Sequence, residues 1–192
     1  KASAQPAVTP TIRGRCGGEC LYGPSAELML VGSMSTAVLG AATAQSFTTK
    51  TITESSTIQG VANTLTFTLR PNIPFSAGNK ITIVGLIGTQ TVLDEESYGL
   101  LALGGPAANS FSPFVDGENR HGKVHWTKSS GTLVLTVGSG SVIPNDADTV
   151  FTVVLTNKAS AQPAVTPTIR GLCGGECYGG PNIVESMSAA VL

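Results

Sequence analysis

The chain has 192 residues, a formal net charge of −1 and only 12% charged residues, while 41% of its residues are hydrophobic. This composition can build the core of one domain of about 150 residues, and it excludes a disordered chain. Lysine and arginine are few and unclustered, which excludes nucleic acid as a partner, and no apolar run is long enough to predict a membrane span.

The first twenty residues are written twice. Residues 1–20 recur at 158–177 with one difference, Arg15 against Leu172, and SMSTAVL at 33–39 recurs as SMSAAVL at 186–192. The shift of 157 residues is too long for a solenoid repeat and corresponds to one whole domain per unit. We interpret the chain as about one and a quarter periods of a tandem array.

Each copy of the repeat contains a Cys-Gly-Gly-Glu-Cys motif, Cys16 with Cys20 and Cys173 with Cys177. A zinc site usually needs two such pairs in one domain, and the redox motif has two intervening residues rather than three. We therefore expect each pair to form a local disulfide, with cross-links between units and a metal site as the alternatives. Disulfides imply an oxidising, extracellular compartment.

Serine and threonine account for 41 residues, and no Asn-x-Ser/Thr sequon occurs. A hydroxyl-rich surface suits a secreted protein and offers sites for O-linked rather than N-linked sugar. The expected positions are Thr9 and Thr166, each directly before a proline in the repeat.

The repeat also sets the expected domain boundaries. Residues 1–32 are interpreted as the last strand and cysteine turn of a unit junction, residues 33–171 as the domain, and residues 172–192 as the start of the next repeat. We expect residues 186–192 to leave this domain and add a strand to its neighbour, with residues 33–39 in the corresponding role at the near end. The predicted inter-unit contact residues are Ser33, Met34, Ala37, Val38, Leu39, Ser186, Met187, Ala190, Val191 and Leu192.

Between the two copies the sequence alternates apolar and hydroxyl residues, most clearly in TLTFTLR at 64–70. Period-two alternation predicts strands with one buried face. Strands are expected within 45–59 and at 64–70, 80–86, 89–93, 123–126, 132–137 and 149–156, separated by Gly, Pro and Asn turns. The predicted inward residues are Leu65, Phe67, Leu69, Ile81, Ile83, Leu133, Leu135, Phe151, Val153 and Leu155.

Residues 94–120 break this pattern and are expected to form a long irregular excursion. Acidic residues at 94–96, and Asp146 with Asp148, are interpreted as solvated turns, with calcium binding as the alternative. His121 and His125 are interpreted as surface residues rather than a metal pair, and Trp126 as a packing residue rather than a sugar platform.

Short strands at intervals of about ten residues predict an all-β sandwich. The blocks NTLTFTLRPNIPFSAGNKITIVGL and GTLVLTVGSGSVIPNDADTVFTVVLTN resemble immunoglobulin-like repeats of very large extracellular proteins of microbes and microalgae. The resemblance covers roughly residues 55–170 and rests on strand pattern and turn placement. It implies an immunoglobulin-like domain and a stalk, adhesin or filament module.

No nucleophile with a base, no phosphate-binding loop and no metal set is visible, so no enzymatic activity and no cofactor are expected. The sequence favours a structural repeat subunit of an extracellular fibril or surface stalk, joined head to tail by strand addition. The alternative is an adhesive carbohydrate-binding module of a cell-surface protein, whose loop 94–120 contacts the ligand. The expected partners are neighbouring copies of the same unit and attached glycans.

Overall fold

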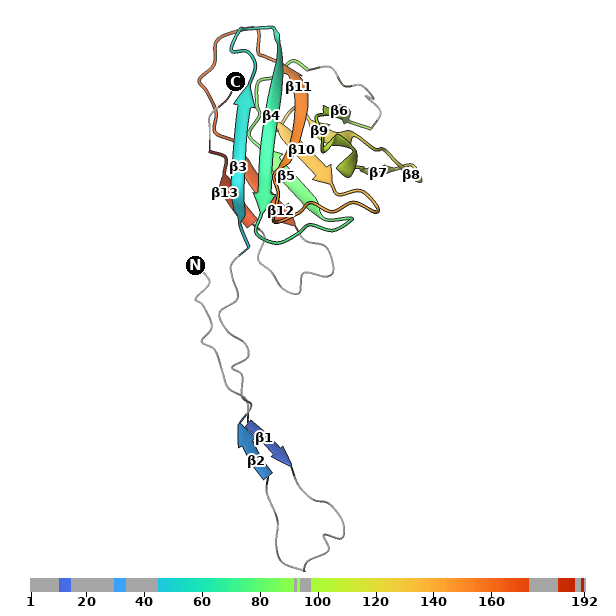
Figure 1. Ribbon diagram of the computed structural model, residues 1–192. Helices are drawn as coiled ribbons and strands as arrows, with labels where there is room; N and C mark the ends of the chain where they lie inside the picture. The colour runs from blue at the N-terminus through green and yellow to red at the C-terminus, as the bar shows by residue number, and fades with distance from the viewer. Residues whose placement is uncertain are drawn as a thin grey trace, which may run out of the picture. The chain divides into compact units, whose positions relative to one another are not determined.

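The computed structural model describes residues 11–14, 30–33, 45–91, 93, 98–172, 183–188 and 191 (Figure 1). Of residues 11–14, 30–33 and 183 only the backbone is described. The chain divides into two compact units, Lys1–Ala44 and Gln45–Leu192. Each unit is described by itself below.

The first unit contains an antiparallel hairpin of β1 (Thr11–Gly14) and β2 (Leu30–Ser33). The second unit holds the other described elements. In chain order these are β3 (Phe47–Glu54), β4 (Ala62–Pro71), β5 (Lys80–Val84), β6 (Leu100–Gly104), the 3₁₀ turn η1 (Ala108–Ser110), β7 (Phe114–Val115), β8 (Glu118–Asn119), β9 (Lys123–Thr127), β10 (Thr132–Thr136), β11 (Thr149–Thr156), β12 (Thr168–Leu172) and β13 (Ile183–Ser186).

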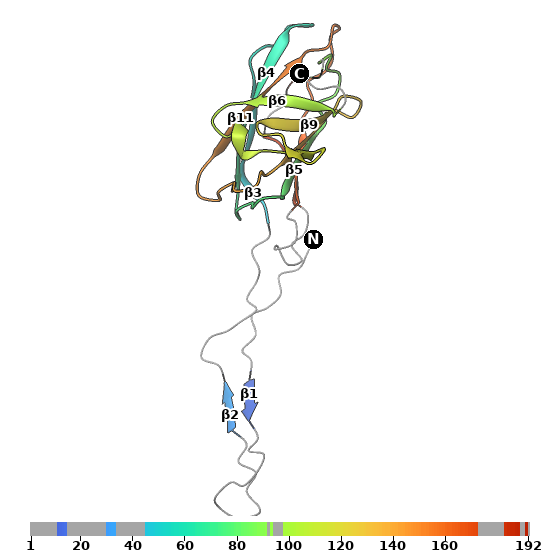
Figure 2. The same cartoon turned by 90° about the vertical axis from the view of Figure 1, so that its right-hand side faces the viewer.

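One antiparallel sheet runs through the second unit in the order β13-β12-β5-β10-β9-β6-β11-β4-β3. Strand β6 belongs to both halves of it, because residues 100–102 pair with β9 and residues 103–104 pair with β11. The sheet therefore turns over at β6 into two layers, with β3, β4 and β11 in one and β9, β10, β5, β12 and β13 in the other (Figures 1 and 2). The two layers face each other across the core, as in a β-sandwich or a flattened barrel.

The core follows directly from the period-two alternation of the strands. In β4 the side chains of Leu65, Phe67 and Leu69 are buried while the threonines between them stay half-exposed. The rings of Phe67 and Phe151 stack at 5.0 Å across the β4–β11 pair. The predicted inward face is confirmed, since all ten residues are at most 1% exposed: Leu65, Phe67, Leu69, Ile81, Ile83, Leu133, Leu135, Phe151, Val153 and Leu155.

A small separate hairpin, β7–β8, lies in the segment that joins β6 to β9 (Figure 1). Asp116 and Gly117, the two residues between the strands, have φ angles of 50° and 80°. Two consecutive positive φ values are those of a type I′ turn, for which Asp-Gly is a preferred pair. The turn places Phe114 at the surface, where the residue is 68% exposed.

Several sequence-based expectations differ from the fold. The compact unit that contains the sheet runs from Gln45 to Leu192, and the repeat-based domain boundaries stay a prediction. The described part of residues 89–93 is not a strand. The segment 94–120, expected to be irregular, contains β6, β7 and β8. Strand β6 has no apolar–polar alternation because its two halves pair in different layers.

Candidate inter-unit interface

The two copies of the repeat form the same hairpin. In the first unit Thr11 pairs with Ser33 and Gly14 with Leu30, and in the second unit Thr168 pairs with Ser186 and Gly171 with Ile183. The first strand reads Thr-Ile-Arg-Gly in both copies, and the register is identical. Residues 1–44 thus carry the counterpart of an element that, in the second unit, is part of a domain.

In the second unit this hairpin completes the sheet through β12. Its five residues pair antiparallel with β5, from Thr168 opposite Val84 to Leu172 opposite Lys80. The hairpin and the residues after it also complete the core, because the side chains of Ile169, Met187 and Val191 are buried. Burial of three such side chains stabilises the domain by roughly 5–9 kcal/mol before the entropy of ordering is subtracted.

The residues after β13 return along the rest of the hairpin arm. The N–H of Met187 donates to the carbonyl of Pro167 at 2.8 Å, and Val165 and Val191 exchange two backbone hydrogen bonds of 3.0 and 2.8 Å. Only isolated residues exchange backbone hydrogen bonds in this stretch, because the prolines of the repeat have no N–H with which to continue a ladder.

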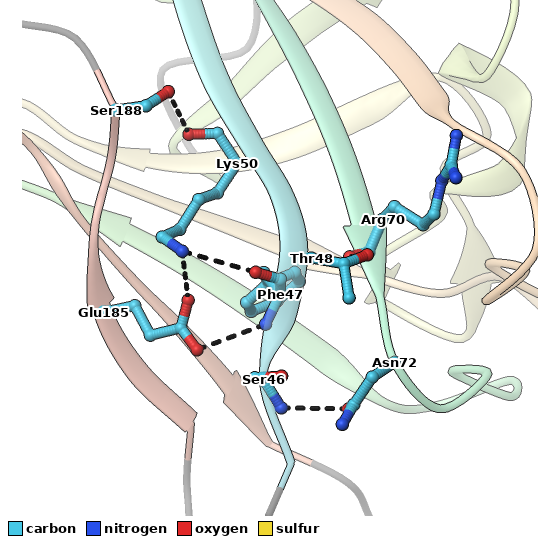
Figure 3. Close-up of polar contacts among 8 residues, drawn as sticks. All are labelled: Ser46, Phe47, Thr48, Lys50, Arg70, Asn72, Glu185 and Ser188. Atoms are coloured by element: carbon cyan, nitrogen blue, oxygen red, sulfur yellow. Dashed lines mark hydrogen bonds and ion pairs between the residues drawn. The ribbon is translucent and has the colours of Figure 1, made fainter.

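A polar clasp joins β13 to β3, the two edge strands of the sheet (Figure 3). One carboxylate oxygen of Glu185 accepts a hydrogen bond of 3.2 Å from the N–H of Phe47, and the other lies 2.8 Å from Nζ of Lys50. The N–H and Oγ of Ser188 both donate to the carbonyl of Lys50 at 3.0 Å. We call these four residues, Phe47, Lys50, Glu185 and Ser188, the edge clasp.

The edge clasp closes the open side of the sandwich. Its contacts advance in the same direction along both segments, so β13 and its continuation run parallel to β3. The start of β3 is itself held in place, because Ser46 and Asn72 exchange hydrogen bonds of 2.9 Å, one through the Asn72 side chain (Figure 3). Two sheet edges that would otherwise invite further strands are thereby covered by each other.

A buried asparagine pair anchors the point where the repeat element leaves the last core strand. Asn63 is fully buried, accepts from the N–H groups of Ser55 and Ser56, and donates to Asn157 Oδ1 at 3.0 Å. Asn157 in turn donates to the carbonyls of Ser56 and Ile58 at 3.0 Å each. Every buried polar atom in this pair has a partner, which orients the chain as residue 158 begins the repeat.

Three of the predicted inter-unit contact residues lie on the second unit itself, and docking of this segment on a neighbouring unit stays a prediction. Ser186, Met187 and Val191, expected to leave the domain, lie on it through β13, the buried side chains and the edge clasp. Ser33 ends β2 and pairs with Thr11 in the first unit. The remaining predicted contact residues lie outside the described residues: Met34, Ala37, Val38, Leu39, Ala190 and Leu192.

The predicted disulfide and sugar positions remain predictions. Cys16, Cys20, Cys173, Cys177 and Thr9 lie outside the described residues. In sequence, each cysteine pair falls between the two strands of its hairpin, β1 and β2 or β12 and β13. Thr166 is exposed, as an attachment site for sugar requires.

Of the other candidate sites, the acidic residues at 94–96 lie outside the described residues. Trp126 is 3% exposed in β9, which confirms its packing role. Asp148 forms an exposed ion pair of 2.9 Å with Arg70 rather than facing Asp146. Across the described part of the chain no three His, Cys, Asp or Glu side chains gather closely enough to hold a metal ion. Nor does that part contain a helix long and apolar enough to cross a membrane.

The edge clasp could not be identified from the sequence pattern. Lys50 and Glu185 are isolated charges in otherwise ordinary strands, and more than a hundred residues separate them. One signal was present. When the two hairpins are aligned by their register, Glu185 opposite Ile169 corresponds to Gly32 opposite Ile12, a charged residue against one without a side chain.

The hairpin that closes the domain in the second unit recurs in the first unit, and a function for the chain has to explain this recurrence. Comparison with known proteins adds no family to this description: no protein-family model matches the chain, and no curated protein matches it.

Proposed function

We propose that this chain is a structural repeat subunit of an extracellular fibre or surface stalk, with units joined head to tail. The observation that carries the proposal is the pair of hairpins with identical register, β1–β2 and β12–β13. A domain in this array is closed by the hairpin that follows it in sequence. Hairpin β1–β2 is then the closing element of the preceding unit, which makes each period one domain plus one closing hairpin.

The strand pairing supports an immunoglobulin-like domain. Pairs β3–β4, β4–β11, β5–β12 and β12–β13 correspond to the A–B, B–E, C–F and F–G pairs of that fold. The chain departs from antibody domains in two respects, because the single tryptophan lies in β9 and neither β4 nor β12 contains a cysteine. Strands β9 and β10, inserted next to β5, extend one layer.

The joint between units would be short. If Val38 docks as Val191 does, eight residues separate it from Phe47, the first buried residue of the following domain. An extended linker of that length spans at most about 30 Å. A domain of about 150 residues is roughly 40 Å across, so successive units would be spaced by roughly 40–70 Å.

A mechanical role fits the surface better than catalysis. The outward rows of β3, β4 and β11 consist mainly of threonine, and charge is sparse. A hydroxyl-rich surface suits O-linked sugar at exposed positions such as Thr166, with secretion to the cell exterior. Because the two sheet edges cover each other, side-by-side association of strands is disfavoured, and units are left to associate through the chain ends.

The second candidate is an adhesive module that binds carbohydrate through the segment 94–120. The observation that favours it is the 68% exposure of Phe114 on the β7–β8 hairpin, an aromatic ring presented at the surface. Exposed aromatic rings are common anchors of binding surfaces.

Electron micrographs of a chain with three consecutive periods test the choice. The fibre proposal expects straight particles with three beads at a constant spacing within roughly 40–70 Å. A chain with six added Gly-Ser residues after Gly40 is the matched control and should show variable angles between beads. Beads that swing freely without the insertion contradict the fibre, and specific binding of those particles to a glycan array would favour the adhesive module.

A further inference from the structure

The two hairpins of this chain have the same backbone register but differ at the position that contacts β3. Glu185 lies opposite Ile169 in the second hairpin, and Gly32 lies opposite Ile12 in the first. The strand that pairs with β5 has the same four residues in both copies, Thr-Ile-Arg-Gly. Pairing of these four residues with β5 cannot distinguish one hairpin from the other, whereas the fifth residue of the strand, Leu172 opposite Lys80, is Arg15 in the first copy.

The edge clasp does distinguish them. The Glu185 carboxylate takes the N–H of Phe47 at 3.2 Å and Lys50 Nζ at 2.8 Å, and Lys50 Nζ also donates to the Phe47 carbonyl at 3.3 Å (Figure 3). The two charged side chains are only 29% and 22% exposed, so solvent screens their attraction incompletely. A hairpin with glycine at this position leaves the N–H of Phe47 without that acceptor and Lys50 without its carboxylate.

We propose that Glu185 is a specificity-determining residue that reserves the docking site between β5 and β3 for hairpin β12–β13 and disfavours hairpin β1–β2. The proposal rests on the proposed array, in which one chain carries several hairpins of nearly the same sequence. In such an array each domain encounters its own closing hairpin, the hairpins of neighbouring units and the hairpins of second copies of the chain. The Glu185 carboxylate distinguishes hairpin β12–β13 from hairpin β1–β2. An incorrect pairing would cross-link units out of order.

Reversing the charge of Lys50 tests this reservation in the full chain. In Lys50→Glu two carboxylates face each other when β12–β13 is docked, whereas hairpin β1–β2 brings Gly32 and meets no like charge at this position. Hydrogen exchange read by mass spectrometry then reports which hairpin is docked. Fragments that include Arg15 or Leu172 distinguish the two copies of the identical strand.

In the wild-type chain we expect slow exchange in β12 and β13 and faster exchange in β1 and β2. Lys50→Glu should reverse the order, with at least a tenfold loss of protection in β12 and a gain in β1. The double variant Lys50→Glu with Glu185→Lys restores the opposite charges and should restore the wild-type pattern. Adding Ile12→Pro to Lys50→Glu removes a ladder N–H from β1 and should abolish the gain there.

A chromatographic mass measurement identifies the source of the exchanged hairpin. Docking from a second copy gives multiples of 19.5 kDa that increase with concentration. If Lys50→Glu proves unfolded by circular dichroism, Glu185→Gly makes the two hairpins equal at this position, and protection should then be shared between β1 and β12.

The proposal is overturned if a folded Lys50→Glu or Glu185→Gly chain retains the wild-type exchange pattern. It is also overturned if the charge-swapped double variant behaves like Lys50→Glu. Neither result bears on the micrographs of the three-period chain. A straight array with no hairpin selection means that this inference fails while the proposed function stands. Hairpin selection without a straight array means that the proposed function fails.

Discussion

At the scale of single residues, two uncharged side chains hold the point where the repeat element begins. Asn63 and Asn157 are both buried, and together they satisfy backbone groups of the turn between β3 and β4. A buried amide that has all its partners specifies one arrangement of the chain, whereas an unpaired one is costly. This pair fixes the direction in which the repeat element starts.

Replacing Asn157 by alanine should lower the free energy of unfolding by about 2–4 kcal/mol, because the carbonyls of Ser56 and Ile58 and the amide of Asn63 each lose a buried partner. Urea unfolding measures the change. Asn145→Ala is the control, since its exposed contact of 3.5 Å with the Asn72 carbonyl should contribute less than about 0.5 kcal/mol. Equal losses in the two variants would contradict the buried-pair argument.

At the scale of elements, the closing hairpin contributes few contacts of its own to fix its position in the domain. Strands β3, β4 and β11 recruit one another through strictly alternating faces, while the hairpin contributes one short β strand on β5 and three buried side chains. Its docking depends on the core residues already assembled beneath it. Such an element can be replaced by an equivalent copy, which is what a repeat supplies.

The matched methionines of the two copies test where each hairpin belongs. Met187→Ala should destabilise the second unit by about 2–5 kcal/mol, because its buried side chain leaves a cavity. Met34→Ala, at the corresponding position of the repeat, should leave the unfolding midpoint of the same domain unchanged. Equal destabilisation by both changes would place the first hairpin on this domain and contradict the proposed order of units.

At the scale of the whole molecule, the covalent state of the protein should reflect the extracellular compartment that we propose for it. Peptide mapping without reduction is expected to recover Cys16 linked to Cys20 and Cys173 linked to Cys177, each as a ring within one hairpin. The same spectra should show sugar mass on fragments that contain Thr9 or Thr166. Free thiols in both pairs would refute the local disulfides, and bare fragments would refute the glycans.

Much of the domain could be predicted because local patterns are sufficient for it. Alternation of apolar residues with threonine determines which face of β4, β10 and β11 is buried, since successive side chains of a strand point to opposite sides. The duplicated first twenty residues predict the array independently of any fold. These inferences need only the order of residues in the chain, and the buried core confirmed the first of them.

Tertiary structure alone decided where the trailing segment goes and how β6 is used. Whether an edge strand pairs at home or with a neighbour depends on which complementary edge lies within reach, and no local pattern encodes that distance. Phe47 and Glu185 are 138 residues apart in sequence, yet their hydrogen bond helps to close the sheet. The sequence by itself determined the faces, the turns and the repeat, while the closure of the domain required two distant edges to meet, a condition that only the assembled layers satisfy.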